Sequence, residues 1–309
     1  MKLYHYDFGQ GTQNFGDDLN RWLLPQLLPG LLDDNPQTTL VGIGTLLNER
    51  LSAETPHAQQ RLIFSTGAGY GDGSYRPGPC DRVYCVRGPL TAQALGLPSA
   101  SAIADGAVLV RRFYGAPAQK HCAFAYMPHI EQIADRAWQS VCAELGIGYL
   151  DPRWPTERIL EGIGRTEVLL TEAMHGAIVA DALRVPWVAV ATHPHILPFK
   201  WQDWCASLQV AYEPHPMEPL WNASPVRDAL APLRTARDRA RRKAALRQMS
   251  EIVRTARPLL SRDQDLERAT VRLEECVARL ARDICQGDFE TLPTPRFDLG
   301  ARQRSLAHH

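Results

Sequence analysis

The sequence predicts an α/β fold in which two Rossmann-like domains face each other across a cleft, followed by a helical extension. Short apolar segments alternate with segments of helical periodicity over residues 1–112, and the same alternation returns over residues 113–215. Two such series are typical of two parallel sheets covered by helices. Over residues 216–309 the strand signals stop and long polar helical segments replace them, which predicts the extension.

The composition is that of an ordinary globular protein. The 309 residues are 45% hydrophobic, with 34 basic and 34 acidic side chains, so the formal net charge is zero. This balance argues against nucleic acid as the main partner. Without an apolar run of signal-peptide or transmembrane length, we expect a cytoplasmic protein. The seven cysteines are odd in number and lack C-x-x-C spacing, which favours reduced thiols over a zinc site.

The first domain is predicted to begin with a strand over residues 2–8, a polar loop and a helix over residues 19–28. Asp17 or Asp18 is well placed to cap this helix and to complement its dipole, and Pro25 predicts a kink or an early end. Further strands are expected at residues 39–43, 61–65, 82–86 and 102–110, with a helix at residues 89–95.

Two glycine-rich turns and an arginine follow the predicted strands of this domain. Gly44 and Gly67 lie in turns that let the backbone approach a ligand closely, although neither turn forms a dinucleotide or Walker motif. Arg87 lies at a strand end beside a helix N-terminus, where its guanidinium could hold a phosphate or a carboxylate with two hydrogen bonds. A surface arginine paired with a neighbouring carboxylate is the alternative interpretation.

The second domain contains a strand, a turn, a helix and a strand over residues 167–191. Glu172 and His175 lie at its strand-to-helix junction, where ligands meet an open α/β sheet. The backbone N–H groups at a helix N-terminus favour an anion there. Around this unit we expect strands at residues 121–126 and 148–150, helices at residues 130–145 and 156–164, and a polar, aromatic segment that includes His193, His195, Lys200 and Trp201.

The extension contains a strongly basic segment. Residues 227–247 carry eight Arg or Lys side chains against Asp228 and Asp238, a net charge of +6. A solvated helix face is one interpretation, and a surface that meets anionic lipid headgroups is the other. Ser261 with Gln264 resembles a capping box, which predicts a second helix to about Cys285.

Five short pieces occur in a fixed order over most of residues 1–205. They are Asn14-Phe15-Gly16-Asp17-Asp18, Gly42-Ile43-Gly44, Val86-Arg87-Gly88-Pro89 with Thr91, Ala104-Asp105-Gly106-Ala107, and Glu172-Ala173-Met174-His175-Gly176. The ordered set resembles the polysaccharide pyruvyl transferase family, and is most similar to the bacterial ketal pyruvyltransferases of exopolysaccharide synthesis. The chain departs from the family in having Glu172, Ala173 and Met174 where a serine or arginine is often found before the histidine, and Gly106 where proline is common.

The resemblance implies a fold like that of the two-domain GT-B glycosyltransferases. It implies phosphoenolpyruvate as the donor substrate, with no cofactor and no metal, and a lipid-linked oligosaccharide or polysaccharide as the acceptor. The product would be a cyclic pyruvate ketal on a sugar. Such an enzyme would work in the cytoplasm, with a peripheral contact at the cytoplasmic face of the inner membrane left open.

The chemistry of this transfer suggests roles for particular residues. We expect His175 to act as general acid or base, because a histidine can move protons near neutral pH. Asp17 is expected to be its partner or a second base, and Arg87 to neutralise charge on the leaving phosphate. The expected substrate-binding residues are Asn14, Gly16, Asp18, Gly44, Gly67, Glu172, Lys200 and Trp201.

Two other functions are compatible with the sequence. A GT-B nucleotide-sugar glycosyltransferase would need an acidic or aromatic contact to the nucleotide, for which Glu172 is near the right place. A non-catalytic carbohydrate-binding subunit is disfavoured, because polar residues cluster at the predicted strand ends.

His193 and His195 form a loop H-x-H without a third partner, so we expect no metal there.

Overall fold

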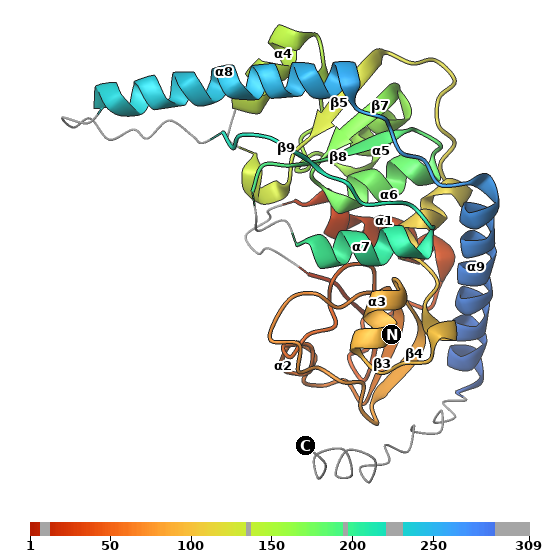
Figure 1. Ribbon diagram of the computed structural model, residues 1–309. Helices are drawn as coiled ribbons and strands as arrows, with labels where there is room; N and C mark the ends of the chain where they lie inside the picture. The colour runs from red at the N-terminus through yellow and green to blue at the C-terminus, as the bar shows by residue number, and fades with distance from the viewer. Residues whose placement is uncertain (7–12, 134–136, 194–196, 221–230, 288–309) are drawn as a thin grey trace, which may run out of the picture.

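The computed structural model describes residues 1–6, 13–133, 137–193, 197–220 and 231–287. It contains two parallel sheets with helices packed against them, stacked one above the other in Figure 1. Helix α9 (Asp263–Gln286) runs beside the N-terminal sheet, and α8 (Ala231–Thr255) crosses the outside of the C-terminal sheet next to α4 (Ala137–Leu145). Two parallel α/β sheets confirm the mixed α/β class predicted from the alternating pattern.

The N-terminal sheet has four parallel strands in the order β1-β2-β3-β4. These are β1 (Lys2–Tyr4), β2 (Thr38–Val41), β3 (Gln60–Thr66) and β4 (Asp81–Val86). The last five residues of β3 are all buried, as expected for a strand covered on both faces. The helices of this half are α1 (Phe15–Leu27), α2 (Leu51–Glu54) and α3 (Pro89–Ala94).

Two predictions for this half are wrong. Helix α1 begins at Phe15 with Asn14 at the N-cap position, so Asp17 and Asp18 lie in its first turn and do not cap it. The strand expected at residues 102–110 does not form: a 3₁₀ helix, η1 (Ser99–Ser101), precedes this range, and a second, η2 (Gly106–Arg112), occupies its C-terminal half. Asp105 caps the second, because its Oδ1 accepts the N–H of Ala107 at 3.0 Å.

The C-terminal sheet has five parallel strands in the order β6-β5-β7-β8-β9. They are β5 (Cys122–Met127), β6 (Gly148–Tyr149), β7 (Thr166–Thr171), β8 (Trp187–Ala191) and the unpredicted β9 (His215–Pro216). The predicted helix over residues 130–145 is divided into η3 (Ile130–Gln132) and α4, and residues 134–136 lie outside the described residues. The remaining helices are α5 (Thr156–Gly164), α6 (Met174–Ala182) and α7 (Pro198–Ser207).

One large hydrophobic cluster connects the two sheets. It joins Phe15 of α1, Leu109 of η2, Ile178 of α6 and Leu273 of α9, all of which are fully buried. Helix α6 of the C-terminal half packs directly against η2, which brings its N-terminus close to the N-terminal sheet. The domain boundaries at residues 112 and 215 stay predictions.

The helices of the extension pack on the body of the protein. Along α9 the apolar side chains of Leu266, Leu273 and Leu280 are fully buried, whereas Val271 is 42% exposed. The predicted capping box is wrong, because the N-cap position is Arg262. Ser261 instead donates from both its backbone N–H and its hydroxyl to the buried Asp181 of α6. Within the described residues, no helix combines the length and the apolar character needed to span a membrane.

Candidate functional site

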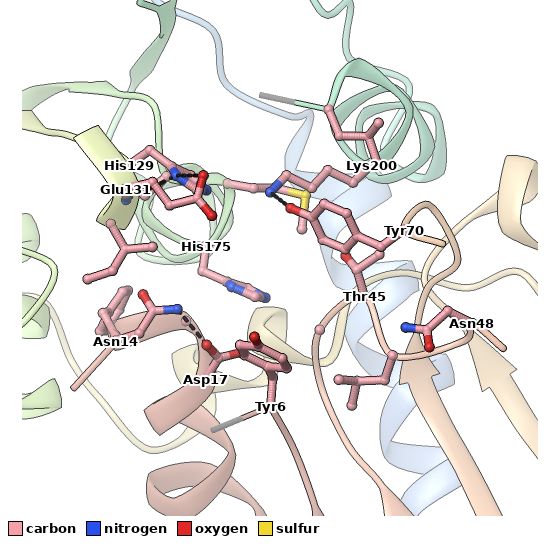
Figure 2. Close-up of a pocket in the computed structure, with 18 of the residues that line it drawn as sticks. Tyr6, Asn14, Asp17, Thr45, Asn48, Tyr70, His129, Glu131, His175 and Lys200 are labelled. Carbon is pink, nitrogen blue, oxygen red and sulfur yellow. Dashed lines mark hydrogen bonds and ion pairs between the residues drawn. The ribbon is translucent and has the colours of Figure 1, made fainter. Parts of the chain in front are cut away.

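The carboxyl ends of both sheets meet at one pocket of about 660 Å³ (Figure 2). The N-terminal sheet contributes residues that follow β1, β2 and β3, and the C-terminal sheet contributes residues that follow β5, β7 and β8. The start of α1 closes the pocket between them. Ligands bind at this edge in open parallel sheets, so the pocket is the candidate active site.

His175 lies at the N-terminus of α6 and points into this pocket (Figure 2). Its Nε2 is buried without a hydrogen-bond partner and lies 3.8 Å from Oδ2 of Asp105, which is also buried and unpartnered. On the other side of the ring, a Cβ at Gly16 would overlap Nδ1 of His175. The imidazole is therefore confined between a buried carboxylate and a glycine whose missing side chain makes room for it.

Asp17 lines the same pocket from the first turn of α1. Asn14 Nδ2 donates to Asp17 Oδ2 at 2.5 Å, and the Asn14 backbone N–H donates to Asp18 Oδ2 at 3.1 Å. Burial raises the pKa of Asp17, although the Asn14 hydrogen bond and nearby His175 act in the opposite direction. The structure thus brings Asn14, Gly16 and Asp17 to the pocket, while Asp18 fastens the start of the helix.

The turn that contains Gly44 is held against α1 by a buried asparagine. Asn20 Nδ2 donates to the carbonyl of Ile43 at 2.9 Å, and Asn20 Oδ1 accepts the N–H of Ile43 at 2.7 Å. A Cβ at Gly42 would overlap the Asn20 amide, so this close approach requires glycine. Gly44 itself lines the pocket. A polar residue on the buried face of a predicted helix was the signal that could have identified Asn20.

Lys200 of α7 lines the pocket from the other side. Its Nζ donates to the hydroxyl of Tyr70 at 2.9 Å and lies 5.3 Å from the centre of the Tyr70 ring. His129, which follows β5, also lines the pocket, and burial together with Lys200 lowers its pKa to about 4. The N–H of Glu131 donates to His129 Nδ1 at 3.4 Å. A neutral His129 then carries its proton on Nε2, where it can donate to a ligand.

The structure places Arg87 away from the pocket, contrary to the expectation for a donor contact. Its guanidinium is fully buried and forms an ion pair with Asp203 of α7 at 3.0 Å. The remaining N–H groups donate to Thr45 Oγ1 at 2.9 Å, the Ala68 carbonyl at 2.8 Å and the Gly44 carbonyl at 3.4 Å. With its donors occupied in this way, Arg87 fastens α7 to the N-terminal sheet.

Gly67, expected to contact substrate, also lies outside the pocket. A Cβ at Gly67 would overlap the guanidinium of Arg87, so this glycine makes room for the buried arginine. Trp201, fully buried, packs 6.1 Å from Trp187 and 6.3 Å from Trp204 between ring centres. Both residues serve packing around α7 and do not face a ligand.

Glu172 is fully buried behind the pocket as well. Its Oε2 accepts from the Tyr126 hydroxyl at 2.9 Å and from the His129 N–H at 3.3 Å, and its Oε1 accepts the N–H of Thr192 at 2.6 Å. Burial raises the pKa of Glu172, while these hydrogen bonds lower it. The carboxyl group joins the ends of β5, β7 and β8 and so positions the loop that carries His129.

Sequence reasoning did not assign three residues that the geometry brings to the site. Asp105 was part of a recognised motif, but its burial beside His175 depends on the packing of η2 against α6. Tyr70 lies in a glycine-rich turn, and His129 follows the end of β5. Such positions are common in binding sites but do not by themselves identify a binding residue.

No group of three or more His, Cys, Asp or Glu side chains suited to a metal ion occurs in the part of the chain that the structure describes. His193 lies in that part, whereas His195 falls within residues 194–196, outside it. The lining of the pocket offers groups that can bind polar ligands and transfer protons, namely the Lys200 ammonium, the Arg50 guanidinium, the imidazoles of His129 and His175, and the carboxyl groups of Asp17, Glu49, Glu54 and Glu131.

Comparison with known proteins gives one extended match. The chain is 41% identical over 218 residues to the succinoglycan biosynthesis protein ExoV of Rhizobium meliloti (strain 1021), which covers 69% of this chain and 67% of that protein. No protein-family model matches the chain. An identity this high over two thirds of both chains indicates a common fold.

Proposed function

Because the chain belongs to the succinoglycan pyruvyltransferase-like family, the polysaccharide pyruvyl transferases, we propose that it transfers the pyruvyl group of phosphoenolpyruvate to a sugar. The acceptor is one sugar of an exopolysaccharide repeat unit, presented as a lipid-linked oligosaccharide or polysaccharide. Two of its hydroxyls become a cyclic pyruvate ketal and phosphate is released. The observation that carries this proposal is His175 at a helix N-terminus in a pocket shared by two parallel sheets, with Lys200 in the same pocket. We also propose that the two sheets adopt the GT-B arrangement.

The donor needs partners for a phosphate and a carboxylate. Lys200 Nζ supplies a positive charge, and the Nε2–H of neutral His129 supplies a hydrogen-bond donor without charge. The unpaired N–H groups in the first turn of α6 supply further donors and the positive end of a helix dipole. These groups lie on the C-terminal side of the pocket, so we assign the donor to that side.

The reaction moves two hydroxyl protons. One sugar hydroxyl attacks C2 of the enol, and a proton is added to the C3 methylene group to form the methyl group. The second hydroxyl then attacks the same C2. The bond between C2 and the phosphate oxygen breaks, and the proton of the second hydroxyl leaves with the phosphate. A base near the hydroxyls and an acid near C3 are therefore required.

His175 is assigned as the group that removes hydroxyl protons. Asp105 acts as a positioning residue, since an Nε2–H facing its free oxygen would leave Nδ1, next to Gly16 in the pocket lining, as the basic nitrogen. Asp17, whose pKa burial raises, holds a proton more readily than an exposed carboxyl group and is assigned as the acid that protonates C3.

The nucleotide-sugar alternative loses its main support. It depended on Glu172 as a contact to the nucleotide, and both oxygens of that carboxyl group accept hydrogen bonds inside the protein. We propose no cofactor for the reaction. The basic helix α8 is retained as a candidate contact with anionic lipid at the cytoplasmic face of the inner membrane.

The test is a transfer assay with phosphoenolpyruvate and the methyl glycosides of glucose and galactose as soluble probes. We expect phosphate release that depends on a glycoside, together with a product whose mass shows the added pyruvyl ketal. His175→Ala should abolish both while leaving the fold intact. His57→Ala, which changes an exposed histidine outside the pocket, is the matched control and should retain full activity. Calorimetric binding of UDP- or GDP-sugars with no binding of phosphoenolpyruvate would refute the proposal.

A further inference from the structure

The two walls of the pocket differ in chemistry. The C-terminal wall carries Lys200, His129, His175 at the start of α6, and the exposed Glu131. The wall contributed by the N-terminal sheet carries tyrosines and side chains with carboxylate or amide groups, among them Tyr6, Tyr70, Asn48, Glu49 and Glu54. An anionic donor and a neutral sugar should therefore prefer different walls.

The aromatic rings of the N-terminal wall are unusually accessible. Tyr6 is 44% exposed and Tyr70 is 45% exposed. Across the described residues, Phe113 is the one other aromatic side chain exposed to a similar extent, and it lies outside the pocket. The face of an aromatic ring is apolar and carries negative charge density, which suits the C–H face of a pyranose. Two of the three accessible rings thus gather where a sugar has to bind.

The charges on this wall are unfavourable for the donor. Glu49 and Glu54 line it together with Arg50, whose Nε lies 4.0 Å from Glu49, so carboxylates remain in excess and repel a phosphate or a carboxylate. The hydroxyls of a neutral sugar can instead donate to such carboxylates and accept from the Asn48 amide. In the proposed function, the positive charge of Lys200 binds phosphoenolpyruvate at the C-terminal wall.

The side chains of Tyr6 and Tyr70 also lie near His175. The Lys200 ammonium fixes Tyr70 through the 2.9 Å hydrogen bond to its hydroxyl. In the view of Figure 2, the His175 ring lies between Tyr6 and Tyr70, and Tyr6 lies beside Asp17. A pyranose stacked on these rings would present its hydroxyl edge to His175 and to the donor beyond it.

We infer that Tyr6 and Tyr70, together with Asn48 and Glu49, form the acceptor subsite, which binds a neutral pyranose by stacking on the two rings. This inference rests on the proposed function for the identity of the donor and of the reaction. The subsite itself is defined by exposure, charge and position on the N-terminal wall, and it can be tested without turnover.

The experiment compares Tyr6→Ala, Tyr6→Phe and Tyr70→Phe with the unaltered protein and with Phe113→Ala, an exposed aromatic outside the pocket. Binding of methyl glucoside and methyl galactoside is measured by saturation-transfer NMR, and binding of phosphoenolpyruvate by calorimetry. Tyr6→Ala should weaken glycoside binding and raise the acceptor KM roughly tenfold, with donor affinity unchanged. Tyr6→Phe, which keeps the ring, and Phe113→Ala should bind the glycosides as the unaltered protein does, whereas Tyr70→Phe, which loses the hydrogen bond from Lys200, should bind them more weakly.

The two hypotheses fail in different ways. Glycoside binding that is equal in Tyr6→Ala and in the unaltered protein, while phosphoenolpyruvate still binds, overturns the subsite and leaves the proposed function standing. Glycoside binding that Tyr6→Ala weakens, in a protein that never binds phosphoenolpyruvate, supports the subsite and overturns the proposed function. Loss of glycoside binding in Phe113→Ala as well would show that the NMR signal does not come from this pocket, which also overturns the subsite.

Discussion

Removal of one partner from the ion pair between Arg87 and Asp203 should be among the more destabilising single substitutions in this protein. Both side chains are fully buried, and they join β4 of the N-terminal sheet to α7 of the C-terminal half. Replacing Arg87 by Met leaves the Asp203 carboxylate buried with hydrogen bonds only from the N–H and hydroxyl of Thr91. Breaking a buried pair by removing one partner typically costs about 3–5 kcal/mol, because an uncompensated charge remains.

Arg87→Met should therefore lower the free energy of unfolding by about 4 kcal/mol, since the acceptors at Thr45 and Ala68 also lose their donor. The double variant Arg87→Met with Asp203→Asn removes the buried charge, while the amide oxygen can still accept the Thr91 N–H. It should recover about 2 kcal/mol of the loss. The free energy of unfolding of each variant is measured by urea unfolding, followed by tryptophan fluorescence. Arg112→Met, which breaks partly exposed ion pairs with Glu267 and Glu274, is a control expected to cost less.

The same variants separate the structural role of Arg87 from the role in donor binding that its position at a strand end suggested. A free energy of unfolding within about 0.5 kcal/mol of the original for Arg87→Met would refute the reasoning. A raised KM for phosphoenolpyruvate in that case would return Arg87 to the donor site. A large loss of stability that Asp203→Asn partly restores would confirm that the guanidinium acts on the carboxylate.

Two further predictions concern side chains in or next to the pocket. Asp105→Asn keeps the oxygen that caps η2 at Ala107 but removes the charge that faces His175. The kcat should therefore fall on the order of tenfold or more, with little change in the KM for phosphoenolpyruvate. An unchanged kcat in the transfer assay would contradict the positioning role of Asp105. The pKa of His129 is lowered to about 4 in the folded protein, against about 6.5 in the unfolded chain, so the unfolded chain binds its proton first as pH falls. Stability should decrease between about pH 6.5 and pH 4, by about 2 kcal/mol from pH 7 to pH 5. In His129→Gln, the free energy of unfolding measured with urea should not show this part of the decrease. The same pH dependence of the free energy of unfolding in both proteins would argue against burial of a neutral imidazole.

The elements with strong local signals were predicted well. Helix α5 and strand β8 have the predicted bounds, because a clear apolar stripe and a fully apolar five-residue segment leave little choice. The failure at residues 102–110 has a local cause. An apolar segment of this length fits a buried strand and a buried 3₁₀ helix equally well, and a single side-chain cap from Asp105 decides between them.

The candidate site was predicted in outline, through His175, Asp17, Asn14, Gly16, Gly44 and Lys200, all of which line the pocket. The order of strands and loops determines which residues come to the carboxyl edge of a sheet, and that order can be inferred from the sequence. Whether a side chain at that edge turns toward the ligand or into the protein depends on partners far along the chain. Glu172 turns inward because the N–H of Thr192 and the hydroxyl of Tyr126 meet it there.

Arg87 shows how such an inward residue can still serve the site. Asp203, its partner, lies three residues after Lys200 on α7, so the buried ion pair fixes the helix that carries the proposed donor-binding ammonium. Lys200 in turn fixes Tyr70, which belongs to the N-terminal wall. We infer that Arg87, a cation behind the pocket, helps to set the distance between the C-terminal wall and the N-terminal wall. A weakened ion pair should accordingly raise the KM values for phosphoenolpyruvate and for the glycoside together, whereas loss of a direct phosphate contact would raise the KM for phosphoenolpyruvate alone.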